Sequence, residues 1–114
     1  MGYYSHFMLT DTTNGVKECP SPIFMENNSE WDMSHFYEDY LEATIKNNHK
    51  PETIKQTIDI SAKYNRSFLL EITDDEDHNN SVQLEIVNGE LRAYKKKVFS
   101  FVDHEIPQNI KDIL

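Results

Sequence analysis

The alternation of apolar and polar residues after position 66 constrains the fold more than any other feature of this chain. The runs "SFLLEIT" at 67–73 and "SVQLEIV" at 81–87 place an apolar residue at every second position, which is the period of a strand with one buried face. Asn88-Gly89 follows the second run directly, and this dipeptide favours the tight turn of a hairpin. A third alternating run, 90–102, contains Lys95–Lys97, which predicts a bulge, an edge or the end of the sheet there. The pattern therefore predicts three consecutive antiparallel strands.

The remaining elements complete an α+β pattern. Residues 3–10, "YYSHFMLT", alternate like a first strand. Residues 29–48 place apolar side chains on one helical stripe, and residues 51–65 begin with a proline suited to the first turn of a second helix. Pro107 is expected to open a short C-terminal helix. We expect one acidic α+β domain over residues 1–114, with an antiparallel sheet of about four strands and two or three helices packed on one face.

The charge of the chain limits the partners that it can bind. Its 114 residues include 20 Asp and Glu against 11 Lys and Arg, for a formal net charge of -9. Direct binding to nucleic acid depends on clustered Lys and Arg that displace counterions, and Lys95–Lys97 is the one basic run. An acidic surface instead favours proteins with a basic surface and repels anionic membranes. We expect no direct nucleic-acid binding and no membrane association, although plain solubility also explains the acidity.

The sequence shows no sign of secretion or membrane insertion. The start "MGYYSHFMLT" has neither the charge nor the apolar stretch of a signal peptide. No apolar run approaches the roughly 18 residues of a membrane-spanning helix. Cys19 is the only cysteine, so no disulfide can form within the chain. The expected location is the cytoplasm.

The acidic stretch "TDDEDHNN" at 73–80 invites comparison with a calcium-binding loop. Counted from Asp75, the oxygen ligands Asp75, Asp77 and Asn79 fall at suitable positions. The sixth position is Asn80 instead of glycine, and the twelfth is Ile86 instead of a bidentate glutamate. The stretch is therefore predicted to be a polar hairpin tip, and no metal site is expected.

No catalytic motif is present. The five histidines never fall at the paired spacing of a zinc-binding helix, no serine lies in a GxSxG elbow, and three glycines cannot build a phosphate loop. Cys19 has no neighbouring base. His35 and Asp39 could form a general base with its orienting acid, or simply a surface pair. We expect a non-enzymatic protein without a cofactor.

The segment from Trp31 to Tyr40 is rich in rings and acids. It holds four rings in ten residues, which is more than one helix face can bury. The rings could all serve the core, or some could anchor a partner, because Trp and Tyr are frequent anchors of interfaces. The candidate partner-binding residues are Trp31, Phe36, Tyr37 and Glu38, with a secondary acidic contact from Asp74, Asp75, Glu76 and Asp77.

Two parts of the chain resemble a group of small accessory proteins of tailed phages. These parts are the opening Met-Gly-Tyr-Tyr with its alternating strand, and "ISAKYNRSFLLEI…VNGELRAY"; together they cover residues 1–9 and about 58–94. The chain lacks the tryptophan and the Gly-Glu dipeptides that the group carries in its last hairpin. The resemblance implies a phage or prophage gene, and such genes often encode inhibitors of host enzymes or of anti-phage defence, including CRISPR effectors.

These observations favour a non-catalytic, phage-encoded inhibitor acting in the cytoplasm of an infected bacterium. It would bind a host or defence protein that handles nucleic acid, such as a CRISPR effector, through an acidic, aromatic surface that could mimic nucleic acid. One alternative is a sponge for a nucleotide signal, with Arg66, Arg92 and Lys95–Lys97 as phosphate contacts. Another is an immunity or antitoxin protein that neutralises a cognate toxin.

Overall fold

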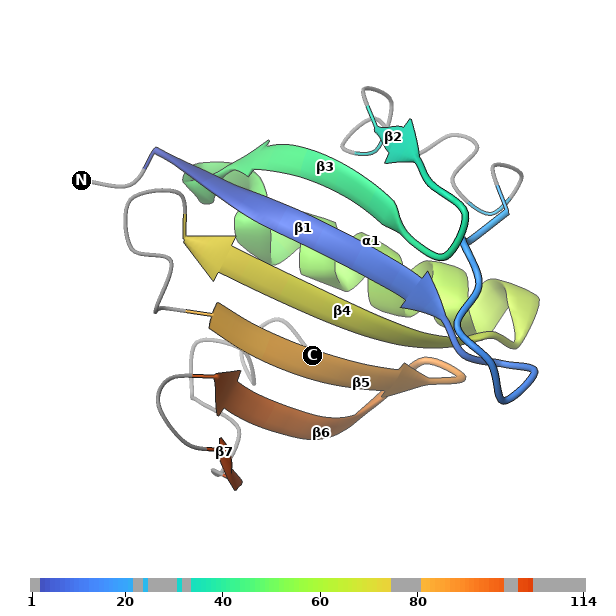
Figure 1. Ribbon diagram of the computed structural model, residues 1–114. Helices are drawn as coiled ribbons and strands as arrows, with labels where there is room; N and C mark the ends of the chain where they lie inside the picture. Colours follow the sequence, from blue (N-terminus) through green and yellow to red (C-terminus); the bar gives the residue numbers. More distant parts are fainter. Residues whose placement is uncertain are drawn as a thin grey trace.

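The computed structural model is an α+β fold in which one antiparallel sheet curves around a single long helix (Figure 1). It describes residues 3–21, 24, 31, 34–74, 81–97 and 101–103, with the backbone alone at 95–97 and 101–103. The strands in these ranges are β1 (Tyr4–Asp11), β2 (His35–Phe36), β3 (Leu41–Lys46), β4 (Ser67–Asp74), β5 (Ser81–Val87), β6 (Glu90–Lys97) and β7 (Phe101–Asp103). A 3-10 turn, η3 (Asn47–His49), leads from β3 into the helix α1 (Lys50–Tyr64).

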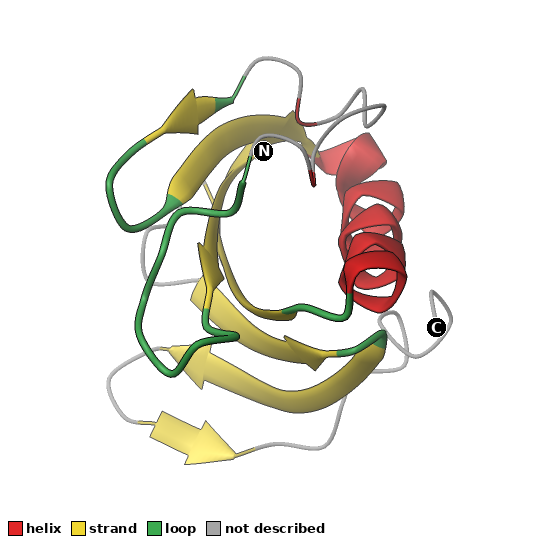
Figure 2. Cartoon of the chain, turned by 90° about the vertical axis from the view of Figure 1, so that its right-hand side faces the viewer, coloured by secondary structure: helices red, strands yellow, loops and turns green. Residues whose placement is uncertain are grey.

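The seven described strands lie in the order β2-β3-β1-β4-β5-β6-β7. The N-terminal strand β1 is thus interior: Phe7 is in register with Ala43 of β3 on one side and with Ile72 of β4 on the other. The chain leaves β3, passes through α1 and returns to the sheet as β4 beyond β1. Figure 2 shows the sheet wrapped around α1, which covers its concave face. The opposite, convex face is called the open face below.

The core lies between α1 and the concave face. Alternate residues of each central strand point into it, as the two-residue period of a strand requires. The buried apolar residues are Phe7, Leu9, Trp31, Leu41, Ala43, Ile45, Ile54, Ile58, Phe68, Leu70, Ile72, Leu84 and Ile86. The helix also buries Thr53 and Thr57, whose hydroxyls donate to the carbonyl oxygens four residues earlier at 2.9 and 2.8 Å. These bonds satisfy the hydroxyls, so the polar side chains can lie inside.

The three consecutive strands expected from the alternating pattern are confirmed as β4, β5 and β6. Asn88 and Gly89 both have positive φ, 47° and 82°, as the two-residue turn between β5 and β6 requires. A bulge does occur in β6, but at Arg92 instead of in the lysine run: Glu85 pairs with Ala93, whereas Ile86 pairs with Leu91. The extra residue reverses the phase of the strand, and Tyr94 therefore packs against the core in register with Leu84.

The prediction of a helix at 29–48 is wrong. This part of the chain instead contains β2, a turn and β3, where Leu41, Ala43 and Ile45 are buried in alternation. A lone sheet edge beside β1 would leave its backbone groups unpaired, and the 41–46 segment satisfies them, overriding a helical stripe that carries only weak local preference. The described sheet thus has seven strands instead of about four. The described part of the chain has one α-helix instead of two or three.

The second expected helix is confirmed as α1, and it ends at Asn65 in the left-handed conformation, with φ 51°. The helix expected from Pro107 lies outside the described residues. Within the described ranges, the fold has no helix with the length and hydropathy needed to cross a membrane.

Candidate interaction surface

An exposed aromatic cluster lies on the hairpin between β2 and β3. The hairpin tip is Tyr37–Tyr40; the Tyr37 N–H donates to the Tyr40 carbonyl at 2.9 Å and closes it. The two tyrosine rings stack, with centroids 4.7 Å apart and planes inclined by 20°. Phe36 and Tyr37 are 45% and 46% exposed. Because the stacking already orders both tyrosine rings, little conformational entropy remains to be lost when a partner covers them.

Two exposed carboxylates, Glu38 and Asp39, lie between the stacked tyrosines. Among the described residues no Lys, Arg or His bonds to either. Partial burial raises the pKa of the Tyr40 phenol, and Tyr37, Glu42 and Asp39 raise it further. The phenol therefore keeps its proton at neutral pH and can donate a hydrogen bond. The hairpin tip thus presents apolar rings, a phenol donor and negative charge together.

Cys19 contacts the hairpin at the backbone of Tyr37. Burial raises the pKa of its thiol, a hydrogen bond from the Tyr37 backbone lowers it in part, and the charge of Asp39 raises it again. The thiol is therefore protonated at neutral pH. Since the thiolate is the nucleophile, this environment disfavours covalent chemistry at Cys19.

Of the aromatic anchors expected from the sequence, the structure leaves Phe36 and Tyr37 on the surface and places Trp31 in the core. Trp31 is 2% exposed. Its ring meets Phe7 edge to face, with centroids 6.0 Å apart and planes at 71°, an arrangement that aromatic quadrupoles favour. Its Nε1 has no hydrogen-bond acceptor within the described part of the chain. As a surface anchor, Trp31 is therefore corrected to a core residue.

Of the acidic contact expected at 74–77, the structure describes Asp74, which lies far from the hairpin tip. Asp74 is in register with Ser5, at the end of the sheet where Lys46 completes β3. The hairpin tip precedes Leu41, at the other end of the same strand. At about 3.4 Å per residue, β3 separates them by roughly 17 to 20 Å, so they do not form one patch. Asp75, Glu76 and Asp77 lie outside the described residues.

The strand register instead aligns other acids across the open face, beginning with Glu42 next to the hairpin. Met8 in β1 is in register with Glu42 on one side and Glu71 on the other. Glu85 follows on β5, in register with Leu69. These carboxylates are remote in sequence, and only the strand order and register place them together. The alternating pattern indicates which side of its own strand each glutamate occupies. It does not indicate that the three glutamates lie on the same face of the sheet.

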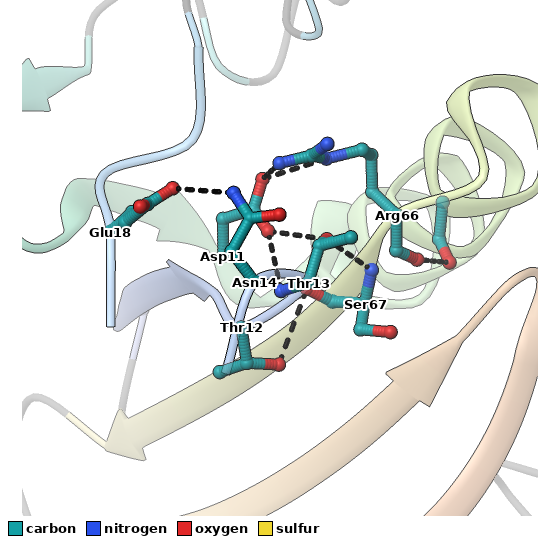
Figure 3. A network of polar contacts seen from close by, with 8 residues as sticks. Asp11, Thr12, Thr13, Asn14, Glu18, Arg66 and Ser67 are labelled. Atoms are coloured by element: carbon teal, nitrogen blue, oxygen red, sulfur yellow. Dashed lines mark hydrogen bonds and ion pairs between the residues drawn. The ribbon is translucent and has the colours of Figure 1, made fainter. Parts of the chain in front are cut away.

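Arg66, a phosphate contact in the nucleotide hypothesis, is held in a network of polar contacts (Figure 3). Its Nε and Nη2 both donate to Asp11 Oδ2, at 2.9 and 2.7 Å. The other oxygen, Oδ1, accepts from the N–H and hydroxyl of Thr13 at 2.9 and 2.6 Å. Ser67 N–H in turn donates to the Thr13 hydroxyl at 2.9 Å. The network joins the end of β1 to the start of β4, which is a structural role.

Of the other bases of the nucleotide hypothesis, Arg92 has a described side chain. Arg92 Nε lies 3.1 Å from Glu90 Oε2, on the surface. The side chains of Lys95–Lys97 lie outside the described part. Likewise, within the described ranges no three His, Cys, Asp or Glu side chains are grouped so that they could hold a metal ion.

Comparison of the chain with models of protein families, with curated proteins and with solved structures found no match.

Proposed function

We propose that the protein is a non-catalytic inhibitor, encoded by a phage, that covers a basic surface of a host or defence protein that handles nucleic acid, such as a CRISPR effector. The observation that carries this proposal is the hairpin tip, where the stacked Tyr37–Tyr40 pair and half-exposed Phe36 flank Glu38 and Asp39. The phage origin rests on the resemblance of the opening Met-Gly-Tyr-Tyr and the later segment to phage accessory proteins.

The rings and the acids would contribute differently to binding. Truncating a ring that fills a partner's pocket typically costs about 2 kcal/mol or more, so Phe36 and Tyr37 would set the lifetime of the complex. Carboxylates at the rim mainly speed the encounter with a basic surface. The negative charge continues away from the hairpin across the open face, at Glu42, Glu71 and Glu85. This arrangement supports a surface on which carboxylates mimic the phosphates of nucleic acid.

The test is capture from a lysate of the bacterial host with the tagged chain, followed by binding kinetics with the captured protein. Phe36→Ala/Tyr37→Ala should weaken affinity by at least about tenfold, chiefly through faster dissociation. Glu38→Lys/Asp39→Lys should slow association and flatten its dependence on salt, because the steering charges are reversed.

A matched control is Glu52→Lys/Asp59→Lys, two exposed positions on α1. Each reversal changes the charge by two, so both charge variants move the formal charge from -9 to -5. The control variant Glu52→Lys/Asp59→Lys should retain most of the wild-type association rate. A captured protein that binds both hairpin variants as tightly as the wild type would refute the proposal, and capture of a toxin would favour an immunity protein instead.

A further inference from the structure

A hollow of about 530 Å³ lies at the end of β3 opposite the hairpin tip, beside the N-terminal end of β1. It is lined by Tyr3, Tyr4, Lys46, Asn47 and Asn48. Its volume falls in the range of about 300 to 1,000 Å³ that is typical of small-molecule sites.

Strand pairing and a buried hydrogen bond hold the wall of this hollow in place. Tyr4 is directly opposite Lys46 in the β1–β3 register, so both side chains lie on the open face. The Asn47 N–H donates to the Tyr3 carbonyl at 2.9 Å and ties the start of β1 to η3. The buried Ser5 hydroxyl donates to Asn47 Oδ1 at 2.6 Å, which sets the orientation of that amide. The backbone of the lining and the Asn47 amide are therefore held in place.

The chemistry of the lining is unlike that of the rest of the molecule. The chain carries a net charge of -9, yet the lining residues that the structure describes include a lysine and no acid. Tyr3 and Tyr4 are 68% and 41% exposed and offer two rings. The carboxylate in closest register is that of Asp74, opposite Ser5, whose position belongs to the other face of the sheet. Rings, an ammonium group and amides together suit a ligand with a flat ring and a negative group.

We propose that this hollow binds a nucleotide, with its base against the tyrosine rings and its phosphate at the Lys46 ammonium. Stacking on tyrosine accepts any base, and a lysine supplies the point charge that a phosphate needs. The exposed side-chain amide of Asn48 is suited to hydrogen bonds with the base or sugar. The site is separate from the hairpin tip and does not depend on the proposed inhibitor function.

The test is calorimetric titration of the full chain with adenosine 5′-monophosphate, with adenosine and with inorganic phosphate. The monophosphate should bind about tenfold more tightly than either of the other two, because it alone engages both the rings and the lysine. Lys46→Glu should abolish its advantage over adenosine. Tyr4→Ala should weaken binding about tenfold, whereas Tyr4→Phe, which keeps the ring, should bind as the wild type does.

Lys55→Glu, at an exposed position of α1, makes the same change in charge away from the hollow and should leave binding unchanged. No detectable binding of the monophosphate at millimolar concentration would overturn the proposal, as would equal losses in Lys46→Glu and Lys55→Glu. The hairpin variants should bind the monophosphate normally. Failure of this site is thus distinguishable from failure of the inhibitor proposal.

Discussion

At the residue scale, the buried carboxylate of Asp11 joins two parts of the chain, the turn after β1 and the start of β4. It accepts two hydrogen bonds from Thr13 and two from the guanidinium group of Arg66. Asp11→Ala leaves a largely buried guanidinium without its counter-charge, and breaking such a pair typically costs about 3 to 5 kcal/mol. We expect a loss of about 3 kcal/mol in the free energy of unfolding, measured by urea denaturation.

The exposed ion pair between Arg92 and Glu90 offers the comparison. Its side chains are 57% and 67% exposed, and exposed pairs contribute about 0 to 1 kcal/mol. Glu90→Ala should therefore shift the free energy of unfolding by no more than about 0.5 kcal/mol. Equal effects of Asp11→Ala and Glu90→Ala would show that burial of Asp11 does not matter.

At the scale of elements, the β5–β6 turn docks on the C-terminal end of α1. Gly89 N–H donates to the Ser61 hydroxyl at 3.0 Å, and Gly89 has a φ of +82°. A Cβ there would lie 2.7 Å from Ala62 Cβ, so Gly89→Ala combines backbone strain with a clash. We expect it to lower the free energy of unfolding by about 2 to 4 kcal/mol in urea denaturation.

Comparison with Gly15 separates the cost of backbone strain in Gly89→Ala from the cost of the clash with Ala62. Its φ is +80°, but a Cβ there would meet nothing within 4 Å, so Gly15→Ala should cost only about 1 to 2 kcal/mol of backbone strain. Adding Ala62→Gly to Gly89→Ala should recover the part due to the clash, less the cost of about 1 kcal/mol for a glycine in a helix. If Gly89→Ala costs no more than Gly15→Ala, the turn does not pack closely on α1.

At the scale of the whole molecule, several groups hold their protons more tightly when the chain is folded. Burial raises the pKa of Tyr94, and burial is also the largest cause of the raised pKa values of Cys19 and Tyr40. Each group stabilises the fold fully below its unfolded pKa, about 8.5 for Cys and 10 for Tyr. That contribution is lost as the pH rises through the folded pKa.

The urea midpoint should therefore be steady between about pH 7 and 8 and fall above about pH 9. Tyr94→Phe removes one of the titrating groups and should make the fall above pH 10 shallower. A midpoint that rises with alkaline pH, or an unchanged slope in Tyr94→Phe, would contradict the assignment of these pKa shifts.

The elements with local signals could be predicted from the amino-acid sequence. The alternation in β4 and β5 and the Asn88-Gly89 turn each depend on neighbours within a few residues. The same holds for α1, with Asn65 at its end. Such signals act before tertiary contacts form, so they could be read correctly without knowledge of the rest of the chain. The class of fold, α+β with an antiparallel sheet, follows from them.

The conformation of residues 35–46 and the composition of the surface depend on contacts between distant parts of the chain. That segment fits a helical stripe, but pairing with the second edge of β1 made it a hairpin. The same pairing exposes Phe36 and Tyr37, while Trp31 packs against Phe7 in the core. Strand order and register determine which distant residues become neighbours, and a two-residue period carries no information about either.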